Sequence, residues 1–146
     1  LVSVSHRPND YGLKNAVMMG RVTWESLPEK FRPLPDRLNV VISKTSRLLL
    51  PSGVLEASGI DEALNLLHTK YGESLENIYV IGGAKLYEVA IRHSQCRRIY
   101  LTRIRQRFDC DAFFPKDLSA FHRISVSPEK EEDGQLFCFE VYDRIL

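Results

Sequence analysis

The sequence predicts an α/β domain with a mostly parallel sheet, flanking helices and an antiparallel C-terminal hairpin. Over the first two thirds of the chain, short apolar runs alternate with segments of helical periodicity, which is the pattern of a parallel sheet with crossover helices. The last third alternates apolar and polar residues around an acidic turn that ends in Gly134, which is typical of a hairpin with one solvated face. The length of 146 residues and the hydrophobic content of 44% suit a single domain over 1–146.

Glycine and proline separate the expected elements in the first half of the chain. The apolar run 15–20 predicts a strand that ends in glycine, and good helix formers follow it until Pro28. Two prolines exclude regular structure from 31–37. Residues 38–43 are rich in Val and Ile and predict a buried strand, and 54–57 predict a brief one.

The second half begins with the clearest helix signal of the chain. In 59–72, apolar residues recur at helical spacing, two acidic residues lie in the first turn, and Gly72 follows the last turn. The remaining expected elements are a strand at 77–83, a helix at 84–94, a strand at 97–104 and hairpin strands at 121–129 and 136–145.

Composition excludes several classes of partner. The formal net charge of +1 and pI near 7.9 offer no broad attraction for nucleic acid or an anionic membrane. Three cysteines and four histidines are scattered without the spacing of a disulfide framework or a metal site. No apolar segment is long enough to span a bilayer. We therefore expect a cytoplasmic protein without a metal, a nucleic-acid partner or a membrane span.

The stretch "IYVIGGAKLY" (78–87) runs a buried strand directly through Gly82 and Gly83 into a helix. Backbone N–H groups at such a bend can bind an anion closely because glycine has no side chain, and Lys85 would add positive charge. Taken alone, the paired glycines fit a simple tight turn equally well, because neither GxGxxG nor the P-loop pattern is present.

A second bend of the same design favours the anion site. Gly20 also joins a strand to a helix, and Arg21 and Thr23 follow it. Two such bends could hold the two ends of one multiphosphate ligand. Residues 43–45, Ser-Lys-Thr, are a third candidate phosphate contact, although on composition alone a solvated loop explains them better.

These segments together resemble the dihydrofolate reductase family. The resemblance rests on residues 15–44, on "IYVIGGAKLY", on "IYLTRI" (99–104), on "DAFFP" (111–115) and on "FEVYDR" (139–144), in the family's order and spacing. It extends over nearly all of 15–146. It implies an NADPH-dependent oxidoreductase of one-carbon metabolism, which transfers hydride to C6 of 7,8-dihydrofolate, with protonation at N5, in tetrahydrofolate biosynthesis.

The resemblance also implies roles for individual residues. The implied NADPH-binding residues are Gly20, Arg21, Val22, Thr23, Ser43, Lys44, Gly82, Gly83, Ala84, Lys85 and Leu86. The implied substrate-binding residues are Leu27, Phe31, Leu34, Arg37, Ile81 and Tyr87. Among them, Arg37 resembles the arginine that binds the glutamate α-carboxylate of folate, for which a planar guanidinium is suited. Thr102 resembles the threonine that supports the catalytic carboxylate.

Family members begin with a central strand, a loop and a helix that carries this carboxylate, and the resemblance implies that these would precede Leu1. The chain would then be part of a longer enzyme, a variant without this head, or a piece completed by another polypeptide; the start at Leu1 rather than Met favours the first. A thymidylate synthase domain follows in some relatives.

Two other functions stay open: a catalytically dead NADPH- or folate-binding protein, and a related pterin or riboflavin-pathway reductase. Arg37 and "RPLP" (32–35) favour folate over the last.

Overall fold

The computed structural model describes residues 13–44, 49–104, 115 and 117–145. Two compact units are distinguished, Leu1–Tyr87 and Glu88–Leu146, and each is described by itself. The expectation of one domain over 1–146 stays a prediction. The motif at 111–115 lies outside the described residues except for Pro115.

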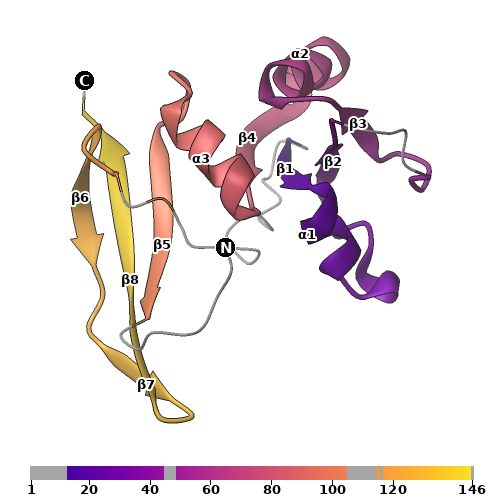
Figure 1. The fold of residues 1–146 in the computed structure, drawn as a ribbon. Helices are drawn as coiled ribbons and strands as arrows, with labels where there is room; N and C mark the ends of the chain where they lie inside the picture. Colours follow the sequence, from indigo (N-terminus) through magenta and orange to yellow (C-terminus); the bar gives the residue numbers. More distant parts are fainter. Residues whose placement is uncertain (1–12, 45–48, 105–114, 116, 146) are drawn as a thin grey trace. The chain divides into compact units, whose positions relative to one another are not determined.

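The first unit contains a parallel sheet of four strands in the order β3-β2-β1-β4 (Figure 1). Each neighbouring pair is parallel, with β1 and β2 in the centre. The expected strands of the first half are therefore confirmed. Their bounds are β1 Lys14–Gly20, β2 Leu38–Ile42, β3 Leu55–Ala57 and β4 Leu75–Val80.

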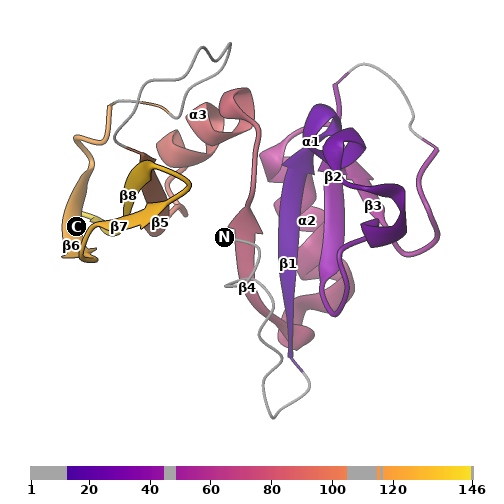
Figure 2. The same ribbon diagram turned by 90° about the horizontal axis from the view of Figure 1, so that it is seen from below.

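Helices and one loop cover this sheet. Figure 2 shows α2 lying across one face, where Ile60, Ala63 and Leu67 are buried. On the other face, Trp24 and Leu34 form a core cluster with side chains of the central strands, Val17, Met19 and Val41. Burial on both faces explains why the central strands are almost continuously apolar. The helices are α1 Arg21–Ser26, η1 Glu29–Phe31, α2 Ile60–Tyr71, η2 Gly72–Ser74 and α3 Ala84–Arg92.

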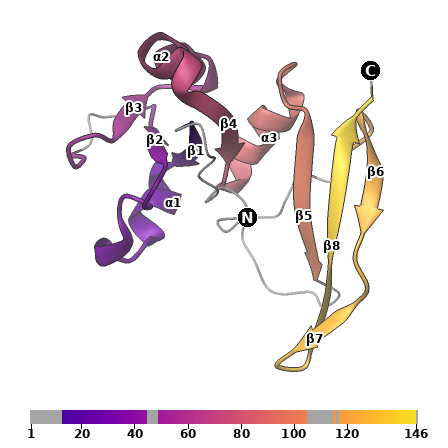
Figure 3. The ribbon, with the colours of Figure 1, turned by 180° about the vertical axis from the view of Figure 1, so that it is seen from behind.

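The second unit contains an antiparallel sheet in the order β5-β8-β6, and the short strand β7 also pairs with β8 (Figure 3). The expected hairpin is confirmed, and its tight turn joins β7 to β8 rather than β6 to β8. Asp133 and Gly134 form this turn with φ of 52° and 78°, the left-handed conformation that an Asp-Gly hairpin turn requires. The bounds are β5 Arg98–Ile104, β6 Phe121–Val126, β7 Lys130–Glu132 and β8 Gln135–Arg144.

The end of α3 is held by an arginine from β8. The Arg144 guanidinium donates hydrogen bonds to the backbone carbonyls of Ile91, His93 and Cys96, at 2.8, 2.8 and 2.7 Å. It also lies over the Phe121 ring, 4.8 Å from its centroid. The last carbonyls of a helix have no donor within the helix, so Arg144 supplies one to Ile91 in the last turn of α3 and joins α3 to the antiparallel sheet.

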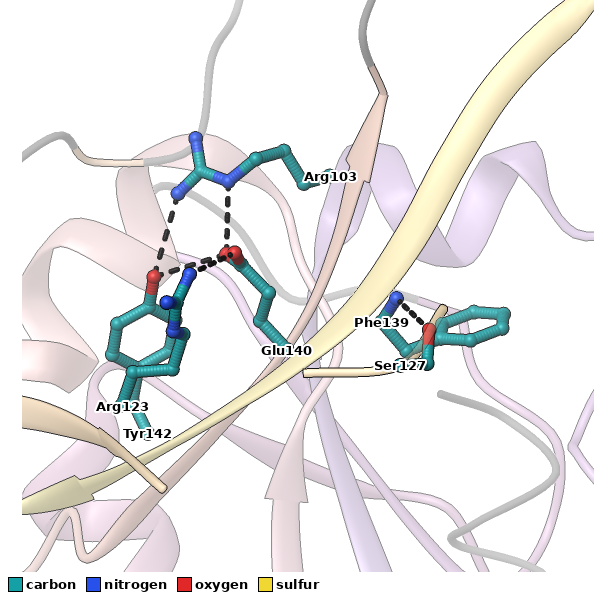
Figure 4. A network of polar contacts seen from close by, with 6 residues as sticks. All are labelled: Arg103, Arg123, Ser127, Phe139, Glu140 and Tyr142. Atoms are coloured by element: carbon teal, nitrogen blue, oxygen red, sulfur yellow. Dashed lines mark hydrogen bonds and ion pairs between the residues drawn. The ribbon is translucent and has the colours of Figure 1, made fainter. Parts of the chain in front are cut away.

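A charged network lies on the antiparallel sheet (Figure 4). The Glu140 carboxylate, which is 4% exposed, accepts hydrogen bonds from Arg103 Nε at 2.8 Å, Arg123 Nη1 at 3.1 Å and the Tyr142 hydroxyl at 2.9 Å. Burial opposes ionisation of Glu140, but these three hydrogen bonds outweigh it and hold the pKa of Glu140 below its ordinary value. A buried carboxylate is tolerated in this strand because its charge is paired.

Candidate functional site

Two glycine bends meet at the carboxyl edge of the parallel sheet. Gly20 ends β1, and Gly82 follows the end of β4. The Gly20 N–H donates a hydrogen bond to the Gly82 carbonyl at 2.8 Å, and the Ile81 N–H donates to the Met18 carbonyl at 3.0 Å. The strand pairing of β1 and β4 therefore continues into the bends and holds them side by side.

The backbone at Gly82 strongly favours glycine. Its φ is +132°, a conformation that side chains rarely allow. A Cβ atom there would also lie 3.3 Å from Thr23 Oγ1 and 3.7 Å from the Tyr87 hydroxyl. The Gly82–Gly83 peptide is cis. The bend therefore presents backbone without side chains, with the hydroxyl groups of Thr23 and Tyr87 close to Gly82, and such backbone allows close approach of a phosphate group.

Short helices follow both bends. The first turn of α3 contains Ala84, Lys85 and Leu86, and the Tyr87 N–H donates to the Gly83 carbonyl at 2.9 Å as the helix begins. N–H groups in a first turn have no acceptors within their helix and give that end a partial positive charge. Burial raises the pKa of the Tyr87 hydroxyl, so it stays protonated at neutral pH.

The positive side chains expected at the cofactor lie on this same edge. Arg21 begins α1 and forms an exposed ion pair with Glu25, with 3.8 Å between Nη1 and Oε1. Ser43 and Lys44 follow the end of β2, where the Ser43 N–H donates to the Ala57 carbonyl at 2.9 Å. Lys44 is exposed, and so is Val22. The described residues of all three predicted phosphate contacts therefore lie along one edge of one sheet, and Thr45 lies outside the described residues.

Three of the predicted substrate residues share an apolar surface. Leu27 and Ile81 pack against the core cluster of the first unit, to which Leu34 belongs. Leu34 is only 7% exposed and serves mainly as core. Phe31 is half-exposed, and the Lys30 ammonium lies 5.0 Å from its ring centroid.

Arg37 lies at the opposite edge of the sheet from the glycine bends. It directly precedes the amino end of β2, which runs parallel to β1 and β4. Its Nε donates to the Pro35 carbonyl at 2.8 Å. Desolvation lowers the pKa of Arg37, and neighbouring Asp36 opposes this change. Because the ordinary pKa of arginine lies far above neutrality, the guanidinium remains charged at neutral pH.

Thr102 belongs to the other unit of the chain. It lies in β5, is exposed, and is the cross-strand partner of Phe139. Its predicted role beside a catalytic carboxylate stays a prediction.

Asn39 is a residue that sequence reasoning missed. It is 3% exposed in the apolar strand β2, and its side chain bonds to the backbone of the loop that carries Arg37. The available signal was a polar residue at the start of the run "LNVVI", where a buried side chain needs partners.

No group of His, Cys, Asp or Glu side chains within the described ranges could hold a metal ion. In the same part of the chain, no helix has the length and apolar character to cross a membrane.

Comparisons with known proteins identify the family. The family model for dihydrofolate reductase matches residues 8–144. Dihydrofolate reductase of Heliothis virescens is 40% identical over 139 residues, which are 90% of this chain and 74% of that protein. The bifunctional dihydrofolate reductase-thymidylate synthase 1 of Arabidopsis thaliana is 40% identical over 141 residues, or 94% of this chain and 27% of that protein.

A solved structure agrees with these matches. Schistosoma mansoni dihydrofolate reductase has a TM-score of 0.84 and 38% sequence identity, and the match covers 99% of this chain and 81% of that one. The resemblance read from the sequence and the predicted fold class are thus both confirmed. From the family match, the sequence identity and the shared fold, the chain belongs to the dihydrofolate reductase family.

Proposed function

We propose that this protein reduces 7,8-dihydrofolate to 5,6,7,8-tetrahydrofolate with NADPH. Family membership supports the reaction. The observation that carries the cofactor assignment is the hydrogen bond that joins Gly20 to Gly82 and sets two glycine bends side by side. When bound, NADPH supplies the hydride, and the chain's residues bind and orient the two reactants.

The proposed cofactor contacts lie along the carboxyl edge of the parallel sheet. The glycine backbone at Gly82 and Gly83, the Thr23 hydroxyl beside it and the first turn of α3 suit the pyrophosphate of NADPH. Arg21, Ser43 and Lys44 would hold the adenosine 2′-phosphate, which distinguishes NADPH from NADH. This division gives the anionic groups of the cofactor separate contacts at the ends of β1, β2 and β4.

The proposed substrate contacts require an elongated ligand. Arg37 precedes the amino end of β2, and the glycine bends follow the carboxyl ends of β1 and β4, so the five residues of β2 separate them by about 16 Å along the strand direction. A pterin beside Ile81 and Tyr87, an aminobenzoyl group against Leu27 and Phe31, and a glutamate carboxylate on Arg37 would match that separation. We also keep the proposal that Thr102 supports the catalytic carboxylate.

The deciding experiment follows NADPH absorbance with and without dihydrofolate, using the natural protein that contains residues 1–146. We expect oxidation of NADPH that depends on dihydrofolate, with formation of equal amounts of tetrahydrofolate. Binding of both ligands without turnover would instead identify a catalytically dead binding protein. Turnover of another pterin or a riboflavin precursor, but not of dihydrofolate, would identify a different reductase.

We propose a small-molecule substrate and a cytoplasmic location for this protein. The unpaired thiols of Cys96 and Cys138 support a reducing compartment. Cell fractionation tests the location. The fusion in the Arabidopsis relative makes a thymidylate synthase domain a candidate partner, and the mass of the protein in its own cells tests whether such a domain is attached.

A further inference from the structure

We propose that Asn39 is a positioning residue that sets the substrate-carboxylate contact of Arg37 and so determines the preference for a ligand with a glutamate tail. The inference rests on the proposed function of Arg37. It concerns a residue that touches neither ligand, and it begins from three hydrogen bonds within the first unit.

The Asn39 side chain binds both ends of one loop segment. Its Oδ1 accepts a hydrogen bond from the Leu34 N–H at 3.0 Å, and its Nδ2 donates to the carbonyls of Leu34 at 3.0 Å and Arg37 at 3.2 Å. An amide side chain is suited to this task because it combines an acceptor and two donors on a short stem.

The loop turns between those two ends, Leu34 and Arg37. The tip residues Pro35 and Asp36 are exposed, and Asp36 has a φ of 58°. The Arg37 Nε donates to the Pro35 carbonyl, so the guanidinium is oriented by the same short segment. Leu34 is fixed at the start by packing in the core. Removing the Asn39 amide would therefore release the carbonyl of Arg37 and the backbone of Leu34 from β2, while the side chain of Leu34 stays buried.

A general stability role makes a different prediction. If Asn39 only stabilises the fold, its replacement affects all ligands alike. If it positions Arg37, the loss is confined to ligands with a glutamate carboxylate. Folate and pteroate are a suitable pair of probes, because pteroate has the same pterin and aminobenzoate but no glutamate.

The experiment measures dissociation constants of folate, pteroate and NADPH for the natural protein and for Asn39→Leu, which has a similar shape and no polar group. We expect folate to bind about tenfold more weakly, while pteroate and NADPH change less than about twofold. Asn15→Leu is the matched control: Asn15 is also 3% exposed in a central strand, but its Oδ1 accepts from the Asn77 N–H of β4. It should lower the melting temperature without changing the folate-to-pteroate ratio.

Each result decides the proposal. Equal weakening of folate and pteroate, or no change in a folded Asn39→Leu protein, would overturn it. If Asn39→Leu does not fold, Asn39→Ser keeps a hydroxyl at the site and should show the same selective loss, smaller in size. The binding experiment does not depend on turnover. If the natural protein binds folate but does not reduce dihydrofolate, the proposed reaction is contradicted, and the role of Asn39 can still be tested. A natural protein that binds neither folate nor pteroate refutes both.

Discussion

The amide N–H of Gly20 donates a hydrogen bond to the carbonyl oxygen of Gly82 at 2.8 Å, across 62 positions of the sequence. This contact extends the β1–β4 pairing beyond the strands and holds two bends without side chains next to each other. The hydrogen bond thus fixes the backbone of the two bends relative to each other. Preorganisation of this kind lowers the cost of ordering the protein on binding.

Replacement of Gly82 by alanine should weaken NADPH binding about tenfold or more. The substitution places a Cβ 3.3 Å from Thr23 Oγ1 and forces alanine to adopt a φ of +132°. Isothermal titration with NADPH measures the effect. Gly134→Ala is the control, because Gly134 also has a positive φ, +78°, but its Cβ would meet nothing within 4 Å. Both variants should lose stability, and a comparable loss of NADPH affinity in the control would refute the assignment of Gly82.

Replacement of Arg37 by alanine should weaken folate binding by about 2–5 kcal/mol, the range for loss of one partner from a hydrogen-bonded charge pair. NADPH affinity should change little, because Arg37 lies at the other edge of the sheet from the glycine bends. The folate affinity of Arg37→Lys should lie between those of the natural protein and Arg37→Ala, since lysine keeps the charge but lacks the planar guanidinium. Fluorescence titrations of each ligand measure these effects. Equal losses for folate and NADPH would contradict the proposed role.

Replacement of Lys44 by alanine should weaken NADPH binding about fivefold at low salt and leave NADH binding nearly unchanged. Lys44 is exposed after the end of β2, so added salt should reduce the difference between the variant and the natural protein. Lys70→Ala, on the exposed surface of α2, is the control for a lost positive charge. Parallel losses for NADPH and NADH would assign Lys44 to another part of the cofactor.

Replacement of Glu140 by glutamine should lower the free energy of unfolding by about 1–3 kcal/mol at neutral pH, because charged hydrogen bonds are lost from a buried site. The folded-state pKa of Glu140 is depressed. Its stabilisation is therefore present above the ordinary carboxyl pKa of about 4.3 and is lost as the pH falls through the lower folded-state pKa.

Urea unfolding of Glu140→Gln and the natural protein, measured from neutral pH downward, checks this dependence. The difference between them should be constant near neutrality and shrink below about pH 4. Asp143→Asn is the control, since the Arg98–Asp143 pair is more exposed and its loss should matter less. A Glu140→Gln difference that stays constant throughout would show that the carboxylate charge contributes nothing.

Elements with a strong local pattern could be predicted from the sequence. The 59–72 helix followed from apolar spacing, an acidic first turn and a terminal glycine, and α2 spans Ile60–Tyr71. The two bends were found because glycine directly follows an apolar run. Fold class and family followed because those signals occur in a characteristic order.

Contacts between distant segments could not be predicted in the same way. The two charged partners of Glu140, Arg103 and Arg123, lie 37 and 17 positions away, so its sequence neighbours do not reveal them. The pairing of β7 with β8 depends likewise on strand register. At Asn39 the polar residue was visible in the sequence, but its three backbone partners depend on the path of the loop.

The most direct measurement is an NMR titration of the isotope-labelled natural protein with NADPH, followed at the backbone amides of Gly20, Gly82, Gly83 and Lys85. We predict saturable shifts at both bends with one common dissociation constant, together with a smaller change at the amide of Arg37, which lies at the other edge of the same sheet. Binding of NADPH that leaves the amides of both bends unshifted would contradict the cofactor site and the proposed reaction that depends on it.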